Sequence, residues 1–253
     1  MTKGVVDNII YLTKFVLLNI QIGGRKLDKK TIVSLRNIFF DYGNEVILNG
    51  IDLDIYDKEF ITLLGPSGCG KTTTLRIIGG FIEPKSGDVY FDSQRINDLP
   101  PHKRNVNTVF QKYALFPHLN VYDNIAFGLR LKKMDKREIE NKVKHMLAIV
   151  DLKGYEKRKI NNLSGGQQQR VAIARALINS PAVLLADEPS GNLDSHNRDE
   201  IHRLFFRLRD ELGQTIVIVT HDEGLASMAD RKITMRDGEI VGNSTFKIQD
   251  SKL

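Results

Sequence analysis

Residues 65–72 read Gly65-Pro66-Ser67-Gly68-Cys69-Gly70-Lys71-Thr72, and this stretch decides the fold. It matches the phosphate-binding loop pattern G-x-x-x-x-G-K-[ST], in which glycines let backbone N–H groups close around phosphate oxygens. An apolar strand-like run, residues 60–64, precedes the loop, and a helix-like run, residues 72–78, follows it. A strand, a glycine-rich turn and a helix in this order predict the core of an α/β nucleotide-binding domain.

The loop also supplies the predicted nucleotide ligands. We expect Lys71 to reach the β and γ phosphates and Thr72 to offer its hydroxyl to Mg²⁺. Cys69, the only cysteine, is expected to face the nucleotide, and the alternative is a small side chain packed out of reach. The full predicted set in this region is Gly65, Pro66, Ser67, Gly68, Cys69, Gly70, Lys71, Thr72 and Thr73.

Two carboxylates follow a second apolar run. Residues 183–186 are typical of a strand buried on both faces, and Asp187 and Glu188 come directly after them, where ligands sit in open parallel sheets. We expect Asp187 to hold Mg²⁺ and Glu188 to orient or deprotonate an attacking water. Taken alone, the two acids also fit a charge pair at a helix N-terminus.

The rest of the chain predicts an α/β fold with a mostly parallel sheet around the loop. Residues 31–61 alternate short apolar runs with turn residues at 41–44, 49–50 and 56–58, which indicates an antiparallel β-lobe. A helical lobe is expected over about 112–165, a helix over 198–212 and a further buried strand over 215–219. We place an N-terminal extension at 1–30, the domain at 31–245 and a tail at 246–253.

Composition narrows the class of protein. With 253 residues, 41% hydrophobic and 27% charged, the chain suits one large folded domain, and a lone cysteine excludes an internal disulfide and favours a reducing compartment. The net charge of +6 fits nucleic acid, a membrane surface or a solvated helix face. The first 30 residues are too interrupted by polar side chains for a spanning helix or a signal peptide, and fit a poorly packed extension or an amphipathic helix.

A third motif, Leu163-Ser164-Gly165-Gly166-Gln167, resembles the signature sequence of ABC ATPases. A serine N-cap and two glycines before helix-forming residues leave a helix start open to a phosphate. The resemblance implies that Ser164, Gly165, Gly166 and Gln167 cover the γ-phosphate bound by a second subunit, so that two ATP molecules are sandwiched in a head-to-tail homodimer.

Four further residues resemble parts of the same family. Tyr42 resembles the aromatic residue that stacks on adenine, although a turn tyrosine would read the same way. Gln111 resembles the glutamine that touches Mg²⁺ and belongs with the catalytic residues, as does His221, which resembles the histidine that senses the γ-phosphate. Asp194 resembles a residue of the loop that crosses the dimer interface, and a simple helix cap is the alternative reading.

Within the family, the first two thirds resemble ATPases of spermidine/putrescine importers. The likeness lies in residues 72–81, 99–104 and 107–118, whereas residues 189–194 and 221–226 resemble ATPases of lipoprotein-releasing and macrolide-efflux systems. We also expect no extra C-terminal regulatory domain of the kind that polyamine-importer ATPases usually carry, because the chain ends at Leu253.

The resemblance implies an ATPase that energises transport from the cytoplasmic face of the cell membrane, with ATP and Mg²⁺ as ligands. Expected partners are a second copy, permease subunits and, for an importer, an extracytoplasmic substrate-binding protein. Polyamine uptake is the expected function, and lipoprotein release or efflux is the alternative. ABC ATPases that act on chromosomes insert long coiled coils, but only about 50 residues separate Gln111 from Ser164, so no nucleic acid is expected.

Overall fold

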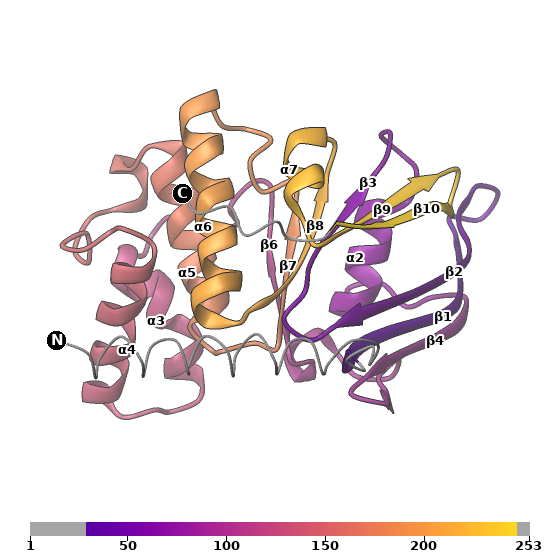
Figure 1. Ribbon diagram of the computed structural model, residues 1–253. Coiled ribbons are helices and arrows are strands. Elements are labelled where there is room, and N and C mark those ends of the chain that lie inside the picture. The colour runs from indigo at the N-terminus through magenta and orange to yellow at the C-terminus, as the bar shows by residue number, and fades with distance from the viewer. Residues whose placement is uncertain (1–28, 247–253) are drawn as a thin grey trace, which may run out of the picture. The chain divides into compact units, whose positions relative to one another are not determined.

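The computed structural model describes residues 29–246 and divides the chain into two compact units, residues 1–30 and 31–253. The extension predicted over 1–30 and the tail predicted over 246–253 lie almost entirely outside the described residues. The second unit contains a four-stranded sheet, a six-stranded sheet and the helices (Figure 1). No helix among the residues described is long and apolar enough to cross a membrane.

The four-stranded sheet confirms the predicted antiparallel β-lobe. Its order is β2-β1-β4-β5, from strands β1 (Thr31–Asp41), β2 (Val46–Tyr56), β4 (Ser86–Phe91) and β5 (Gln94–Arg95). The turn predicted at residues 49–50 was wrong, because β2 runs through it. Gly50 takes a φ of 69° at a register shift, and the buried side chains of Leu48 and Ile51 on either side keep the strand in the sheet.

The six-stranded sheet holds the phosphate-binding loop. Its order is β10-β9-β3-β8-β7-β6, and every neighbouring pair is parallel except β10 with β9. The strands are β3 (Phe60–Leu64), β6 (Val106–Val109), β7 (Val183–Asp187), β8 (Thr215–Thr220), β9 (Arg231–Arg236) and β10 (Glu239–Thr245). β3 and β8 are buried along their whole length, as continuous apolar runs predict.

Helices cover both faces of this sheet (Figure 1). They are α2 (Lys71–Gly79), α3 (Val121–Leu131), α4 (Lys136–Ile149), α5 (Gly165–Leu177), α6 (Ser195–Leu212) and α7 (Glu223–Met228), with 3-10 turns at Pro101–Lys103 and Ile160–Asn162. The predicted helical lobe contains α3 and α4. The helix predicted over 198–212 begins three residues earlier, because the side chain of Asp194 caps it.

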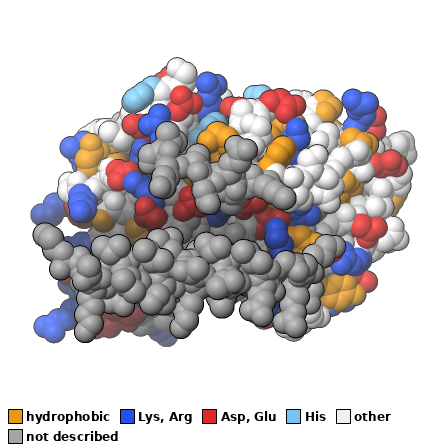
Figure 2. All heavy atoms as spheres, in the orientation of Figure 1, with side chains coloured by type: hydrophobic (Ala, Val, Ile, Leu, Met, Phe, Trp, Pro, Cys, Tyr) orange, Lys and Arg blue, Asp and Glu red, His pale blue; other side chains and the backbone are white. Residues whose placement is uncertain are grey.

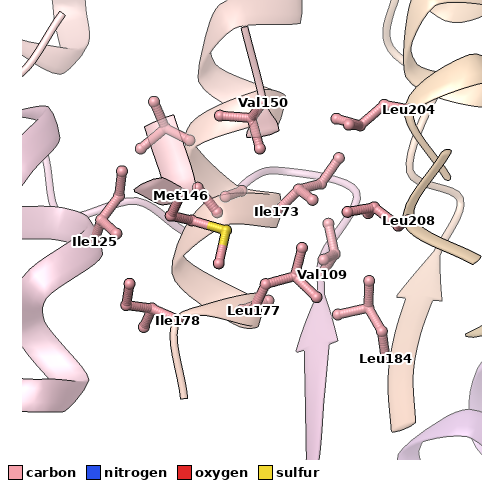
Figure 3. Packing of buried hydrophobic residues seen from close by; sticks show 14 of the residues in the cluster. Val109, Ile125, Met146, Val150, Ile173, Leu177, Ile178, Leu184, Leu204 and Leu208 are labelled. Atoms are coloured by element: carbon pink, nitrogen blue, oxygen red, sulfur yellow. The ribbon is translucent and has the colours of Figure 1, made fainter. Parts of the chain in front are cut away.

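Two buried clusters fill the faces of the parallel sheet. Leu184 points into the cluster with α3–α6, whereas Val183 and Leu185 point into the cluster with α2 and the β-lobe, as alternation along a strand requires. Figure 3 shows the first cluster, where Ile173 and Leu177 of α5 lie between the helical lobe and the sheet. At about 1.5–3 kcal/mol per buried aliphatic side chain, this packing fixes α5 firmly on the sheet that carries the loop.

Candidate nucleotide-binding site

A pocket of about 440 Å³ opens where the parallel strands end. It combines the β-lobe with residues that follow β3, β6, β7 and β8, which is the edge where ligands bind in open parallel sheets. Eleven residues line it, namely Tyr42, Ile47, Ser67, Gly68, Gly70, Lys71, Thr72, Thr73, Gln111, Glu188 and His221. All but Ile47 were predicted from the sequence.

The phosphate-binding loop is pressed against its neighbours so closely that two glycines are required. Gly70 has a φ of 98°, and a Cβ there would lie 2.5 Å from Leu48 Cδ2 and 2.8 Å from the Ile47 carbonyl oxygen. A Cβ at Gly65 would lie 2.3 Å from the Met235 carbonyl oxygen. The loop therefore leads into α2 with bare backbone, which leaves its N–H groups free to approach an anion.

Lys71 is a buried cation held by neutral groups. Its side-chain nitrogen donates hydrogen bonds to the carbonyl oxygens of Gly65 and Pro66, each at 2.8 Å, and the residue is 7% exposed. Within residues 29–246, Lys71 forms no ion pair with a carboxylate. Because a buried charge is costly unless an opposite charge compensates it, the loop suits an anionic ligand such as a phosphate.

The predicted metal ligands converge beside Lys71. The hydroxyl of Thr72 donates to Asp187 Oδ1 at 2.9 Å, and Gln111 lines the same pocket. No group of three or more His, Cys, Asp or Glu side chains in the described chain could hold a metal ion. A hydroxyl, an amide and one carboxylate fit Mg²⁺, which usually takes few protein ligands and completes its shell with phosphate oxygens and water.

Glu188 and His221 meet at the ends of two neighbouring strands. Nδ1 of His221 lies 3.0 Å from Oε1 of Glu188, and both side chains line the pocket. Glu188 has a φ of 46°, a conformation that costs about 1–3 kcal/mol outside glycine and that clusters at functional sites. Its backbone N–H donates to the Val219 carbonyl oxygen at 3.0 Å, so the carboxylate is held above the sheet edge.

The thiol of Cys69 turns away from the pocket. The residue is 4% exposed and packs in the cluster with α2 and the β-lobe, and its sulfur lies 3.7 Å from the Lys71 nitrogen. The expectation that this side chain faces the nucleotide was wrong, because the turn from Gly68 to Gly70 directs it inward. Only its backbone remains available to a ligand.

The signature residues lie outside this pocket. Ser164 caps α5 by accepting from the Gln167 N–H at 3.3 Å, while Gln167 Oε1 accepts from the Ser164 N–H at 3.1 Å. A Cβ at Gly166 would lie 2.3 Å from Asn197 Oδ1, so the start of α5 packs against the start of α6. The chain therefore does not bring Ser164, Gly165, Gly166 or Gln167 to its own phosphate-binding loop.

Asp194 caps α6, as its alternative reading proposed. It accepts from the Asn197 backbone N–H at 2.9 Å, and this hydrogen bond, with a second from the Asn197 side chain, lowers the pKa of its carboxyl group. Tyr42, in contrast, is 60% exposed at the rim of the pocket, with its ring edge-on to Phe40. Its free face suits stacking on a base.

Comparison with known proteins agrees with this geometry. Residues 48–191, more than half of the chain, match the model of the family described as ABC transporter. The chain belongs to this family. The ABC transporter cassette MJ0796, solved as a dimer and in a post-hydrolysis state bound to ADP and phosphate, is 37% identical, with a TM-score of 0.76 over 85% of this chain and 99% of that one. The fold class predicted from the sequence is thereby confirmed.

Curated relatives narrow the resemblance. Spermidine/putrescine import ATP-binding proteins PotA of Clostridium novyi and Desulfitobacterium hafniense are 53% and 54% identical over 83% of this chain. The chain spans 61% and 60% of their lengths, respectively. The structure of cbiO1 from Clostridium perfringens, part of the ABC transporter complex cbiONQ, is 30% identical with a TM-score of 0.79, over 86% of this chain and 89% of that one.

One link of this ABC domain was missed in the sequence. Arg175 on α5 donates to the carbonyl oxygens of Ala114 at 2.7 Å and Tyr113 at 3.2 Å, three and two residues after Gln111. Tyr113 and Ala114 have φ values of 59° and 50°, and the Tyr113 hydroxyl lies 3.1 Å from where a Cβ on Gly165 would be. The guanidinium thus holds a strained segment between the nucleotide pocket and the signature.

Proposed function

We propose that this chain is the ATP-hydrolysing subunit of an ABC transporter. The observation that carries the proposal is the buried ammonium of Lys71, compensated only by carbonyl oxygens, a few ångströms along α2 from the Thr72–Asp187 hydrogen bond. An ATP phosphate chain supplies the missing negative charge and the oxygen ligands together. Membership of the ABC transporter family and the ADP- and phosphate-bound relative support this proposal.

Each predicted site residue has a role in that reaction. Lys71 exchanges its carbonyl partners for β and γ phosphate oxygens, and the backbone of residues 65–70 with Thr73 surrounds them. Thr72, Gln111 and Asp187 would hold Mg²⁺, which neutralises phosphate charge when bound. Glu188 orients a water and takes up its proton, and His221 holds that carboxylate in place. Tyr42 stacks on the adenine.

A second copy of the chain completes the site in this proposal. Ser164 to Gln167 do not line the pocket of their own chain, yet the capped start of α5 presents bare glycine backbone suited to phosphate. In a head-to-tail pair, this segment covers the ATP bound by the partner, and Asp194, at the neighbouring start of α6, lies at the interface.

An aromatic groove on the same unit is the proposed docking surface for a permease. It has a volume of about 350 Å³ and lies between β6, α3 and α5, with the rings of Phe81, Phe110, Phe116 and Phe127 among its walls. Phe81 is 50% exposed, which is unusual for an aromatic residue unless a partner covers it. An apolar helix of a permease fits a groove of this kind, with the chain on the cytoplasmic face of the membrane.

The transported substrate follows from the relatives. We infer uptake of spermidine, putrescine or a similar small cation, because several relatives that are 49–54% identical are spermidine/putrescine import proteins. An importer also needs an extracytoplasmic substrate-binding protein. Export of another substrate, as in lipoprotein-releasing or efflux systems, is the alternative that experiment must separate.

Uptake assays test the function directly. The chain is expressed with the permease genes that neighbour it, and uptake of labelled spermidine is measured with wild-type protein and with the Glu188→Gln variant at equal abundance. The proposal predicts uptake that needs wild-type Glu188. ATP hydrolysis without any effect on uptake would reject the substrate but retain the ATPase, and the absence of ATP hydrolysis would reject both.

A further inference from the structure

The positive charge of the chain is concentrated in the helical lobe. Residues 112–165 contain 12 Lys and Arg against 6 Asp and Glu, whereas the whole chain has 37 against 31. The rest of the sequence is therefore balanced, and the lobe accounts for the entire net charge of +6. Figure 2 shows Lys and Arg side chains at the left edge of the view, on the side where α4 lies in Figure 1.

The densest part of this charge is the segment 130–137, called here the α3–α4 turn. Lys132, Lys133, Lys136 and Arg137 are all exposed, and no side-chain hydrogen bond or ion pair engages them among residues 29–246. The nearby acids are already occupied. Asp135 accepts from the backbone N–H of residues 137 and 138 to cap α4, while Glu138 and Glu140 pair with lysines one turn further along.

Exposed apolar side chains adjoin the α3–α4 turn. Leu131, at the last position of α3, is 71% exposed, and Phe127, four residues earlier and so on the same helix face, is 39% exposed. Phe127 is also part of the aromatic groove. An apolar ridge therefore runs from the groove to four uncompensated cations.

We propose that the α3–α4 turn contacts the surface of an anionic membrane. Leu131 enters the lipid interface, and Lys132, Lys133, Lys136 and Arg137 lie among phosphate-bearing headgroups, a pairing typical of proteins that rest on anionic bilayers. This rests on the proposed function in one respect: if the groove receives a permease helix, its side of the lobe faces the membrane. A merely solvated basic face would not require Leu131 to be exposed beside the cations.

Tryptophan fluorescence offers a direct test, because the chain contains no tryptophan. Leu131→Trp places the only indole at the end of α3, and Val241→Trp, at a residue of β10 that is 57% exposed, is the matched control. We expect phosphatidylglycerol vesicles to shift the emission of Leu131→Trp to the blue, phosphatidylcholine vesicles to leave it unchanged, and neither to affect Val241→Trp. No shift for Leu131→Trp, or an equal shift for both variants, would overturn the proposal.

Charge reversal supplies a second test on the full chain. Lys132→Glu/Lys133→Glu should reduce co-sedimentation with phosphatidylglycerol vesicles about 20-fold or more, since each basic residue near an anionic surface strengthens binding about fivefold. Lys153→Glu/Lys157→Glu changes the net charge equally but lies just before the 156–158 segment that pairs with the start of α3, and should have a much smaller effect. Equal losses for the two variants would show a general charge effect and reject the α3–α4 turn.

Two further outcomes separate this proposal from its neighbours. Residues 1–28 are identical in all variants, so they cannot account for a difference between them. A blue shift of Leu131→Trp with short RNA but not with vesicles would make the surface a nucleic-acid contact and overturn the proposal. Because vesicle binding is measured without ATP, loss of the proposed ATPase function would leave this readout intact.

Discussion

His221 Nδ1 lies 3.0 Å from Glu188 Oε1, joining the ends of two adjacent parallel strands across the mouth of the pocket. His221 is largely exposed, whereas Glu188 is mostly buried and has a left-handed backbone. The histidine therefore acts on the reaction through the position of the carboxylate.

This contact predicts a non-additive pair of variants. His221→Ala should lower the rate of ATP hydrolysis about 100-fold, and adding it to Glu188→Gln should cost little more, because both changes remove one unit. Steady-state rates of the two single variants and the double variant check this. Fully multiplicative losses would mean that His221 acts independently of Glu188.

Lys71→Ala should abolish tight nucleotide binding. The change removes the buried ammonium that compensates the phosphate charge, and charge-assisted hydrogen bonds of about 1.5–3 kcal/mol each predict a loss of affinity on the order of 100-fold. Titration with a fluorescent ATP analogue measures it, with Lys112→Ala as a control outside the pocket. Unchanged affinity would contradict the role of the loop.

Mixed dimers test the shared site. Ser164→Arg should leave ATP binding to each chain intact but block closure, and mixing it with Lys71→Ala creates one composite site with both residues intact and one with both lost. We expect the mixture to recover hydrolysis that neither variant has alone. If activity tracked each chain separately, the signature would serve its own subunit and the sandwich would be wrong.

The inward-facing thiol predicts slow chemical modification. Because Cys69 is 4% exposed, a small maleimide should label it slowly with or without MgATP, and rapidly only after unfolding. Mass spectrometry of the labelled peptide measures the rate. Fast labelling of the folded protein that MgATP suppresses would restore the original expectation that the thiol faces the nucleotide.

The parts of the site that were predictable are those written in local patterns. Lys71, Asp187 and Glu188 each follow a strand and precede a helix or a loop, so periodicity and chemistry place them at one sheet edge. The contact between Arg175 and Tyr113 joins residues 62 apart in sequence, and no local pattern announces it.

The errors have physical causes of the same kind. Residues 49–50 have a strong turn preference, yet burial of the flanking side chains carries β2 through them. The direction of the Cys69 side chain depends on the conformation of the glycines around it, which composition does not encode. Tertiary packing decided both.

Glu188→Gln provides the most direct test of ATP hydrolysis by a nucleotide-sandwiching dimer. The variant keeps the shape of the side chain but loses its charge, so ATP binding should persist while turnover falls about 100-fold or more. Light scattering after gel filtration should then show a dimer with ATP and a monomer without it, with two ATP molecules retained per dimer. A variant that hydrolyses ATP at the wild-type rate, or that stays monomeric with ATP bound, would contradict the account.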